Sequence, residues 1–138
     1  MSKLVGIDFG KARIGLAISD ERKIIAFPLT TIRAEKTLEE SAKKVMEFLT
    51  SYSVEKIVMG LPLLLNGKEG EMAQLARQFA ALLSLPCIFW DERLTSAQIE
   101  KSLKEMELSR KKRSQLSDTL AATLILQNYL DSIYVASS

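Results

Sequence analysis

The chain contains no histidine among its 138 residues. This absence excludes the Ser-His-Asp and Cys-His nucleophile systems, and it excludes every metal site that depends on imidazole ligands. Cys87 is the only cysteine, so an intrachain disulfide and a cysteine-type zinc site are excluded as well. Any hydrolytic chemistry must therefore rest on carboxylates, lysine, tyrosine or a metal ion bound by oxygen atoms.

Glycine, proline and long apolar runs are also scarce. The 6 Gly and 3 Pro residues, without any low-complexity stretch, argue against disorder, repeats or a long linker. The most apolar later run, 120–126, is far too short to span a bilayer, and charges come too early at the N-terminus for a secretory signal. With 47% hydrophobic residues, we expect a cytoplasmic protein, not associated with a membrane, that folds as one domain over residues 1–138.

An excess of charge of one sign is missing too. The formal net charge is only +2, which is too small to indicate nucleic-acid binding by itself, because such binding depends on a local patch that neutralises phosphates. The distribution of the charges therefore matters more than their sum.

The hydrophobic pattern predicts an α/β fold. Extended segments are expected over 3–9, 14–18 and 24–32, where Pro28 marks an edge or a bulge. A capping box of Thr37 and Glu40 then starts a helix that runs to about residue 52. Strand 56–61, a helix over about 73–83 and strand 86–90 follow, then helices over about 95–106 and from Ser114 or Ser117 to about 131. We predict a five-stranded mixed sheet in the order 3-2-1-4-5, with helices on both faces.

Three acidic residues occupy positions that suggest chemistry. Asp8 lies at the end of the first strand, and Glu92 follows the fifth, where open α/β sheets place ligand-binding groups. Asp118 shares its helix face with apolar residues that should pack on the sheet, so an unpaired carboxylate there would be costly. Each also has a structural interpretation: a turn residue for Asp8, or a first-turn acid stabilised by the helix dipole for Asp118.

Convergence of the three carboxylates would explain them together. Hard oxygen ligands without histidine or cysteine select Mg²⁺ or Mn²⁺. The chemistry typical of such a site is two-metal phosphoryl transfer, in which one ion lowers the pKa of the attacking water and the other stabilises the leaving 3′-oxygen. This mechanism needs no histidine base.

The motifs, taken in order, resemble one known family over nearly the whole chain. They are Ile7-Asp8-Phe9-Gly10 with Arg13-Ile14-Gly15, Gly60-Leu61-Pro62-Leu63 followed by Asn66-Gly67, Asp91-Glu92-Arg93-Leu94-Thr95, and Asp118 with Ala121-Ala122 and Leu126. Any one of them is a weak signal, but four in order are specific. The chain is similar to the YqgF or RuvX-like family of pre-16S ribosomal RNA nucleases.

This resemblance implies a ribonuclease H-like fold, divalent-metal nuclease activity and trimming of the 5′ end of 16S ribosomal RNA during ribosome maturation. The family's acidic positions fall on Asp8, Glu92 and Asp118, as catalytic residues and metal ligands. Two departures are visible: the family usually has Asn where this chain has Leu64, and usually a polar residue where it has Ala12. Leu64 could change loop contacts to substrate, but neither departure removes a metal ligand.

Five cations near these motifs are candidates for binding substrate phosphate. They are Lys11, Arg13, Arg93, Lys112 and Arg113, of which the last two belong to a run of four cations at 110–113. Each could instead be an ordinary exposed charge or form a surface salt bridge.

The same sequence features are compatible with other functions. The same acidic trio could serve a resolvase acting on four-way DNA junctions, as a dimer, whereas the rRNA nuclease could be a monomer or homodimer. A noncatalytic RNA-binding assembly factor would tolerate loss of Asp8. An actin-like ATPase also begins with Asp-x-Gly and a glycine-containing hairpin, but it needs a second lobe for which this chain is too short.

Overall fold

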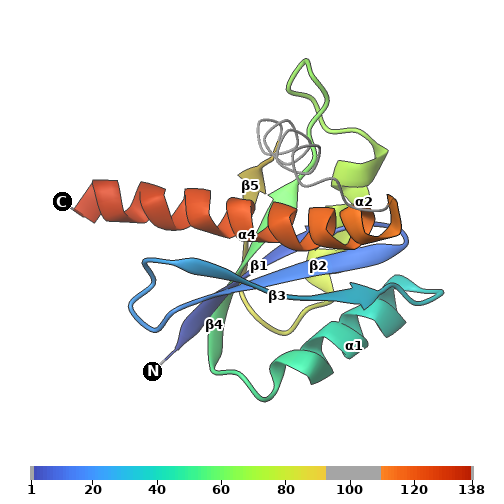
Figure 1. The fold of residues 1–138 in the computed structure, drawn as a ribbon. Helices are drawn as coiled ribbons and strands as arrows, with labels where there is room; N and C mark the ends of the chain where they lie inside the picture. The colour runs from blue at the N-terminus through green and yellow to red at the C-terminus, as the bar shows by residue number, and fades with distance from the viewer. Residues whose placement is uncertain (1, 93–109, 138) are drawn as a thin grey trace.

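The structure is a computed structural model that describes residues 2–92 and 110–137, with side chains described for 2–92 and 118–133. Its centre is a five-stranded sheet in the order β3-β2-β1-β4-β5 (Figure 1). The central strand β1 (Lys3–Phe9) pairs antiparallel with β2 (Arg13–Ser19) and parallel with β4 (Val54–Leu61). Strands β3 (Ala26–Arg33) and β5 (Cys87–Asp91) form the edges. The predicted strand order is confirmed.

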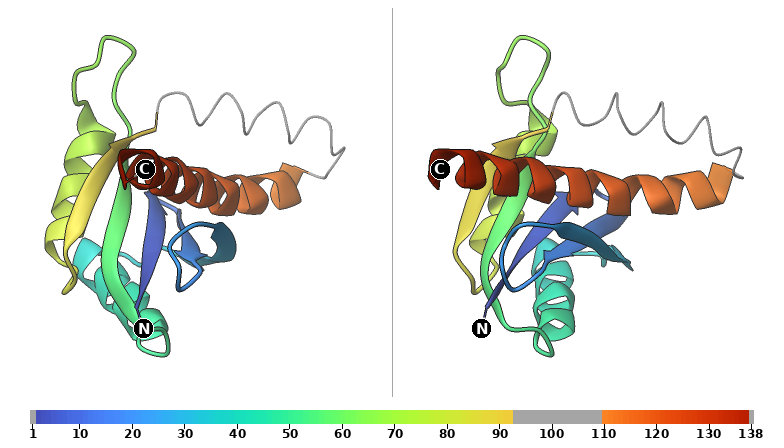
Figure 2. Two further views of the ribbon diagram at one scale, coloured as in Figure 1. Left: turned by 90° about the vertical axis from the view of Figure 1, so that its left-hand side faces the viewer. Right: turned by 60° about the vertical axis from the view of Figure 1, so that its left-hand side comes forward.

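Helices cover both faces of this sheet, as predicted. Helices α1 (Leu38–Leu49) and α2 (Glu71–Ala81) pack on one face, and α4 (Arg110–Ser137) crosses the other (Figure 2). Side chains along β1 alternate between the two faces of the sheet. Val5 and Ile7 lie in the core under α1 and α2, and Leu4 lies in the core under α4. A side chain facing α4 from β1 therefore lies between the sheet and that helix.

Local signals in the sequence explain several element boundaries. The Thr37 hydroxyl accepts a hydrogen bond from the Glu40 backbone N–H at 3.1 Å, as the capping box predicted, although α1 ends at Leu49 rather than near residue 52. Pro28 lies on the edge strand β3, beside a register shift against Leu16 and Ala17 of β2. Proline cannot donate to a central ladder, so an edge or bulge is where it is tolerated.

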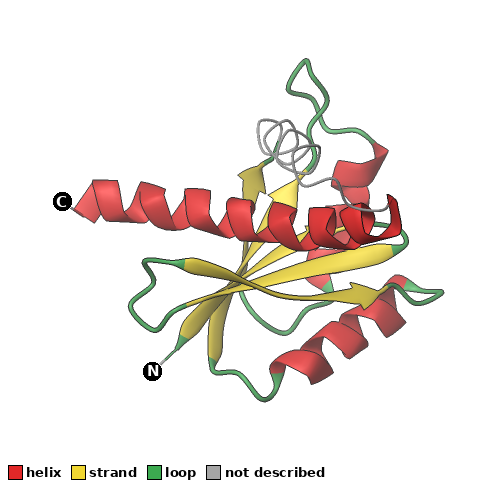
Figure 3. Cartoon of the chain, viewed as in Figure 1, coloured by secondary structure: helices red, strands yellow, loops and turns green. Residues whose placement is uncertain are grey.

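The last helix differs from the prediction. The described part of α4 already includes Arg110 and runs to Ser137 as one continuous helix (Figure 3). Ser114 and Ser117 therefore lie inside the helix rather than at its start. No proline or glycine interrupts this stretch, and Lys, Arg, Leu and Ala favour helix, so the serines do not end it. The helix predicted over 95–106 lies outside the described residues.

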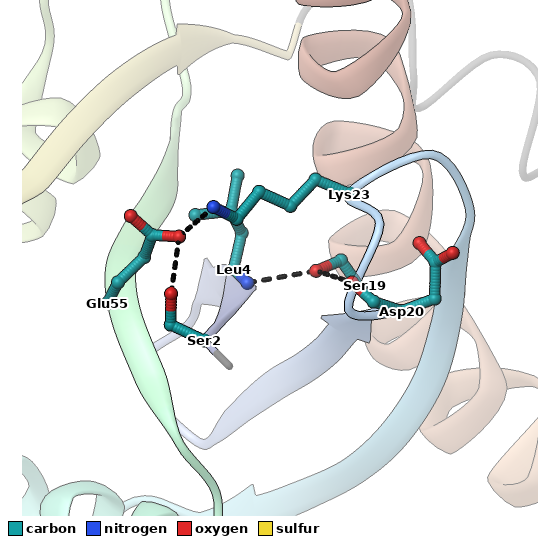
Figure 4. A network of polar contacts seen from close by, with 6 residues as sticks. All are labelled: Ser2, Leu4, Ser19, Asp20, Lys23 and Glu55. Carbon is teal, nitrogen blue, oxygen red and sulfur yellow. Dashed lines mark hydrogen bonds and ion pairs between the residues drawn. The ribbon is translucent and has the colours of Figure 1, made fainter.

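A polar network fastens the end of the sheet where β1 begins (Figure 4). Glu55 accepts a hydrogen bond from Ser2 at 2.8 Å and forms an ion pair with Lys23 of the β2–β3 turn. The backbone N–H of Leu4 donates to the Ser19 hydroxyl at 2.9 Å. These contacts join the starts of β1 and β4 to the hairpin.

None of the described helices is long and apolar enough to span a membrane.

Candidate active site

The candidate site lies where the carboxyl ends of β1, β4 and β5 meet the layer of α4. Asp8 stands opposite Gly15 in the β1–β2 ladder, and its position in β1 directs its side chain toward α4. Glu92 directly follows β5, and its backbone N–H donates to the Leu61 carbonyl at the end of β4. The structure therefore brings together two carboxylates that are far apart in the sequence.

Two strand glycines allow the acidic residues to come this close. A Cβ atom at Gly60 would collide with the Glu92 carboxylate and would lie 2.5 Å from Ile125 of α4. A Cβ atom at Gly15 would collide with the backbone carbonyl of Asp118. Both sites are close approaches in which any larger residue would force the carboxylates or α4 outward.

The carboxyl groups of Asp8 and Glu92 share a hydrogen bond. Burial, followed by the negative charges of Glu92 and Asp118, raises the pKa of Asp8 from 3.8 to about 8. Burial also raises the pKa of Glu92, to about 7, against the lowering effect of its hydrogen bond with Asp8. Two adjacent carboxylates of this kind cannot both ionise cheaply, so the pair holds a proton near neutral pH.

One atom of this pair lacks a partner. Glu92 Oε2 is buried and accepts no hydrogen bond from any described residue, which is costly for a carboxylate oxygen. The Asp8–Glu92 pair thus combines hard oxygen donors, an unsatisfied buried oxygen and a local excess of negative charge. These features fit a divalent cation, which would satisfy the oxygen and displace the shared proton.

Asp118 is held differently. Its carboxylate accepts a hydrogen bond from Arg13 Nε at 2.7 Å, and the two side chains are 22% and 41% exposed. Among the described side chains, no three acidic or cysteine residues lie close enough together to bind one metal ion. Asp118 is near enough to influence the pKa of Asp8, but it faces Arg13 rather than completing a three-carboxylate cluster.

Of the other cations predicted to bind substrate, the structure describes the side chain of Lys11. Lys11 forms an exposed ion pair with Glu71 at the start of α2, at 3.0 Å. Arg93 lies outside the described residues, and so do the side chains of Lys112 and Arg113, although their backbone is part of α4.

The two departures from the family pattern both lie in surface segments. Leu64 is 50% exposed and its methyl groups lie beside Gly70. Ala12 is exposed in the β1–β2 turn, where its carbonyl accepts a hydrogen bond from Ala34 at 2.9 Å. Neither residue contacts the Asp8–Glu92 pair.

Sequence reasoning missed two features of the site. The Arg13–Asp118 ion pair joins residues 105 positions apart, and no local pattern links them. The close approaches at Gly15 and Gly60 had a visible signal, since a glycine inside a strand often marks a near neighbour, but the neighbour itself could not be identified from sequence.

Comparison with protein families places this arrangement in a known group. Residues 2–132 match the family model described as "RuvX: Holliday junction resolvase". A protein of Protochlamydia amoebophila is 48% identical over 95% of this chain and 94% of its own length, and one of Caldanaerobacter subterraneus is 45% identical over 94% and 96%. Both carry the name "Putative pre-16S rRNA nuclease".

Solved structures support the fold. RuvC of T. thermophilus in complex with a Holliday junction substrate has a TM-score of 0.55 at 16% identity, covering 97% of this chain and 96% of that one. The Fowlpox virus resolvase bound to Holliday junction DNA also has a TM-score of 0.55, at 13% identity, covering 95% and 98%. The chain therefore has the ribonuclease H-like fold of these resolvases.

Proposed function

The chain belongs to the RuvX family, and from this membership we propose that it is a divalent-metal-dependent nuclease that hydrolyses phosphodiester bonds in nucleic acid. Its substrate is the precursor of 16S rRNA, trimmed at the 5′ end in the cytoplasm during ribosome biogenesis. The names of the relatives support this substrate.

One observation carries the proposal: Asp8 and Glu92 share a hydrogen bond, while the second Glu92 oxygen is buried and has no partner among the described residues. An arrangement with no task beyond stability would be expected to satisfy that oxygen. In an enzyme, an unsatisfied buried oxygen of this kind is expected where the carboxylates are positioned to bind a cation.

Asp8 and Glu92 would hold Mg²⁺ or Mn²⁺, and Asp118, which faces Arg13 in the structure, would turn toward them to become the third ligand. Bound divalent ions supply Lewis acidity, which lowers the pKa of an attacking water and stabilises the leaving oxygen in a two-metal mechanism. The protein contributes position and charge. Asp8 is fixed by the central strand, Glu92 by its backbone bond to Leu61, and Asp118 by the close contact of α4 with Gly15.

The substrate backbone would be bound by the five cations that the sequence motifs suggest: Lys11, Arg13, Arg93, Lys112 and Arg113. Phosphate contacts of this kind give affinity and position rather than sequence selectivity.

The deciding experiment is metal-dependent cleavage of an RNA that spans the mature 5′ end of the 16S precursor. We expect cleavage with Mg²⁺ or Mn²⁺ and none with chelator, and a loss of at least about 100-fold for Asp8→Asn, Glu92→Gln and Asp118→Asn. Glu55→Gln, which removes a carboxylate at the opposite end of the sheet, is the matched control and should keep full activity. Cleavage that survives all three site substitutions would overturn the mechanism.

A four-way DNA junction is the second substrate to test, because the RuvX model is described as a Holliday junction resolvase. Faster cleavage of the junction than of the RNA would move the proposal to a resolvase, which would act as a dimer on two strands. Full cellular function of Asp8→Asn would indicate a noncatalytic RNA-binding assembly factor instead.

A further inference from the structure

Arg13 lies at the boundary between the acidic cluster and the solvent. It is the first residue of β2, and its Nε donates to Asp118 Oδ2 at 2.7 Å across 105 positions of sequence. The arginine side chain is 41% exposed, whereas the aspartate is 22% exposed. The guanidinium group therefore has one edge on the carboxylate while part of its surface reaches the solvent.

The hydrogen-bond pattern of this guanidinium is incomplete. Arginine carries five N–H donors in a rigid plane, and the contact with Asp118 uses only the one on Nε. No residue within 2–92, or within the described side chains of 118–133, accepts a hydrogen bond from its two terminal nitrogens. That edge has the fork geometry that fits two oxygens of a phosphate group.

Other cations near the site are placed differently. Lys11, two residues away in the β1–β2 turn, forms its ion pair with Glu71 rather than with the cluster. Arg33 stands opposite Arg13 in the β2–β3 ladder and is exposed, but among the described side chains the ion pair of Asp118 is with Arg13. Among the described residues, Arg13 is thus the cation in direct contact with the carboxylates of the site.

We infer that Arg13 bridges the acidic cluster and the substrate: its Nε fixes the Asp118 carboxylate, and its terminal nitrogens bind a backbone phosphate of the nucleic acid. This inference rests on the proposed function, because it takes a nucleic acid as the ligand. It assigns one specific contact and its geometry within the proposed set of cations.

Charge explains why a bridge is needed here. A phosphate that approaches these carboxyl groups is repelled by their net negative charge, and solvent screens this repulsion less where the groups are partly buried. A fixed cation in contact with both the carboxylate and the phosphate separates the two negative groups. Lysine could offset the charge, but as a point charge it cannot hold a carboxylate on one edge and a phosphate on the other.

The test measures binding without metal, so that it does not depend on activity. Affinity for a labelled RNA spanning the mature 5′ end of the 16S precursor is determined by fluorescence anisotropy in EDTA over a series of salt concentrations. The variants are Arg13→Gln and Arg13→Lys, with Arg33→Gln as the matched control that removes the same charge from the neighbouring strand. Thermal unfolding confirms that each variant is folded.

We expect Arg13→Gln to weaken binding about tenfold or more and to reduce the salt slope by about 0.7, the value for one phosphate contact on a single strand. Arg13→Lys should remain at least about threefold weaker than the wild type, while Arg33→Gln changes affinity less than about twofold. If Arg13→Gln does not fold, Arg13→Lys decides the question alone.

Equal losses for Arg13→Gln and Arg33→Gln, or wild-type affinity for Arg13→Lys, would overturn the bridge. The same samples with Mg²⁺ separate this inference from the nuclease proposal. Binding that depends specifically on Arg13, without any cleavage, would refute the nuclease and leave the bridge standing. Cleavage by a protein whose binding is insensitive to Arg13 would do the opposite.

Discussion

Gly60 lies against the carboxylate of Glu92, so closely that a Cβ atom at this position would collide with Glu92 Oε2. The strand that carries Gly60 therefore determines where the glutamate can lie. The same Cβ atom would also lie 2.5 Å from the Ile125 side chain of α4. Any residue larger than glycine at position 60 would therefore displace the glutamate, the helix or both.

Gly60→Ala should abolish nuclease activity and lower the free energy of unfolding by about 1–3 kcal/mol, the usual cost of overpacking. Cleavage assays and urea denaturation measure the two effects. The matched control is Gly70→Ala, whose Cβ would have the half-exposed Leu64 side chain as its nearest neighbour, at 3.1 Å, and that side chain can move aside. It should keep its activity, and a normally active Gly60→Ala protein would contradict the packing described.

The Asp8–Glu92 pair should make stability depend on pH in the absence of metal. The pKa of Asp8 is raised from 3.8 to about 8, so the folded state binds more protons than the unfolded state between these values. In EDTA, the contribution of this bound proton to the free energy of unfolding is therefore fully present near pH 4. It is lost as the pH rises to about 8, by up to about 1.4 kcal/mol per pH unit for each proton released.

Urea denaturation in EDTA over this pH range measures the dependence, and Asp8→Asn should flatten it. Adding Mn²⁺ should stabilise the wild type more at pH 8 than at pH 6, because metal and proton compete for the same oxygens. A wild-type curve that rises steadily from pH 5 to pH 8 in EDTA would show that the pair is ionised and would contradict the shared proton.

Gln127 of α4 should contribute to stability through the β2–β3 hairpin. Its side-chain oxygen accepts a hydrogen bond from the Ala26 N–H at 2.8 Å, and its nitrogen donates to the Ile24 carbonyl at 2.9 Å. Gln127→Ala leaves both backbone groups without this partner, so we expect a loss of about 1–3 kcal/mol in urea denaturation. Replacing the neighbouring exposed residue, Asn128→Ala, should change stability by less than about 0.5 kcal/mol.

The basic run at 110–113 should contribute to RNA affinity. We expect Lys112→Ala with Arg113→Ala to weaken binding to the 16S precursor RNA and to flatten its salt dependence, by about 0.7 in slope for each phosphate that the protein no longer neutralises. Anisotropy titrations at several salt concentrations test this. An unchanged slope would assign these cations to the solvated surface of the helix.

Much of the fold could be predicted from periodicity. Alternation in β1 and β2, the capping box at Thr37 and the apolar run of β4 are local patterns, and the rule for right-handed crossovers then leaves few sheet orders. The predicted start of the last helix was wrong because Ser114 and Ser117, taken as N-caps, can also occupy the interior of a helix, and the Lys, Arg, Gln and Leu residues around them favour helix.

The candidate site was predictable only in part. Asp8 and Glu92 stand at strand ends, where a sheet gathers ligands, so their approach could be expected. That Asp118 faces Arg13, or that Gly60 touches Glu92, depends on side-chain packing between elements that are distant in sequence. Such contacts leave no periodic trace, and they are the part that requires the structure.

The position of Asp118 on the last helix also has a consequence for the timing of activity in a growing chain. Synthesis produces the sheet first, with Leu4, Ala17 and Val58 uncovered until α4 arrives to bury them. The third carboxylate and the cover of the core therefore come with the same segment. A nascent or truncated chain that lacks α4 has an exposed apolar face and an incomplete set of acidic groups, so we expect it to be unable to cut RNA before it is finished.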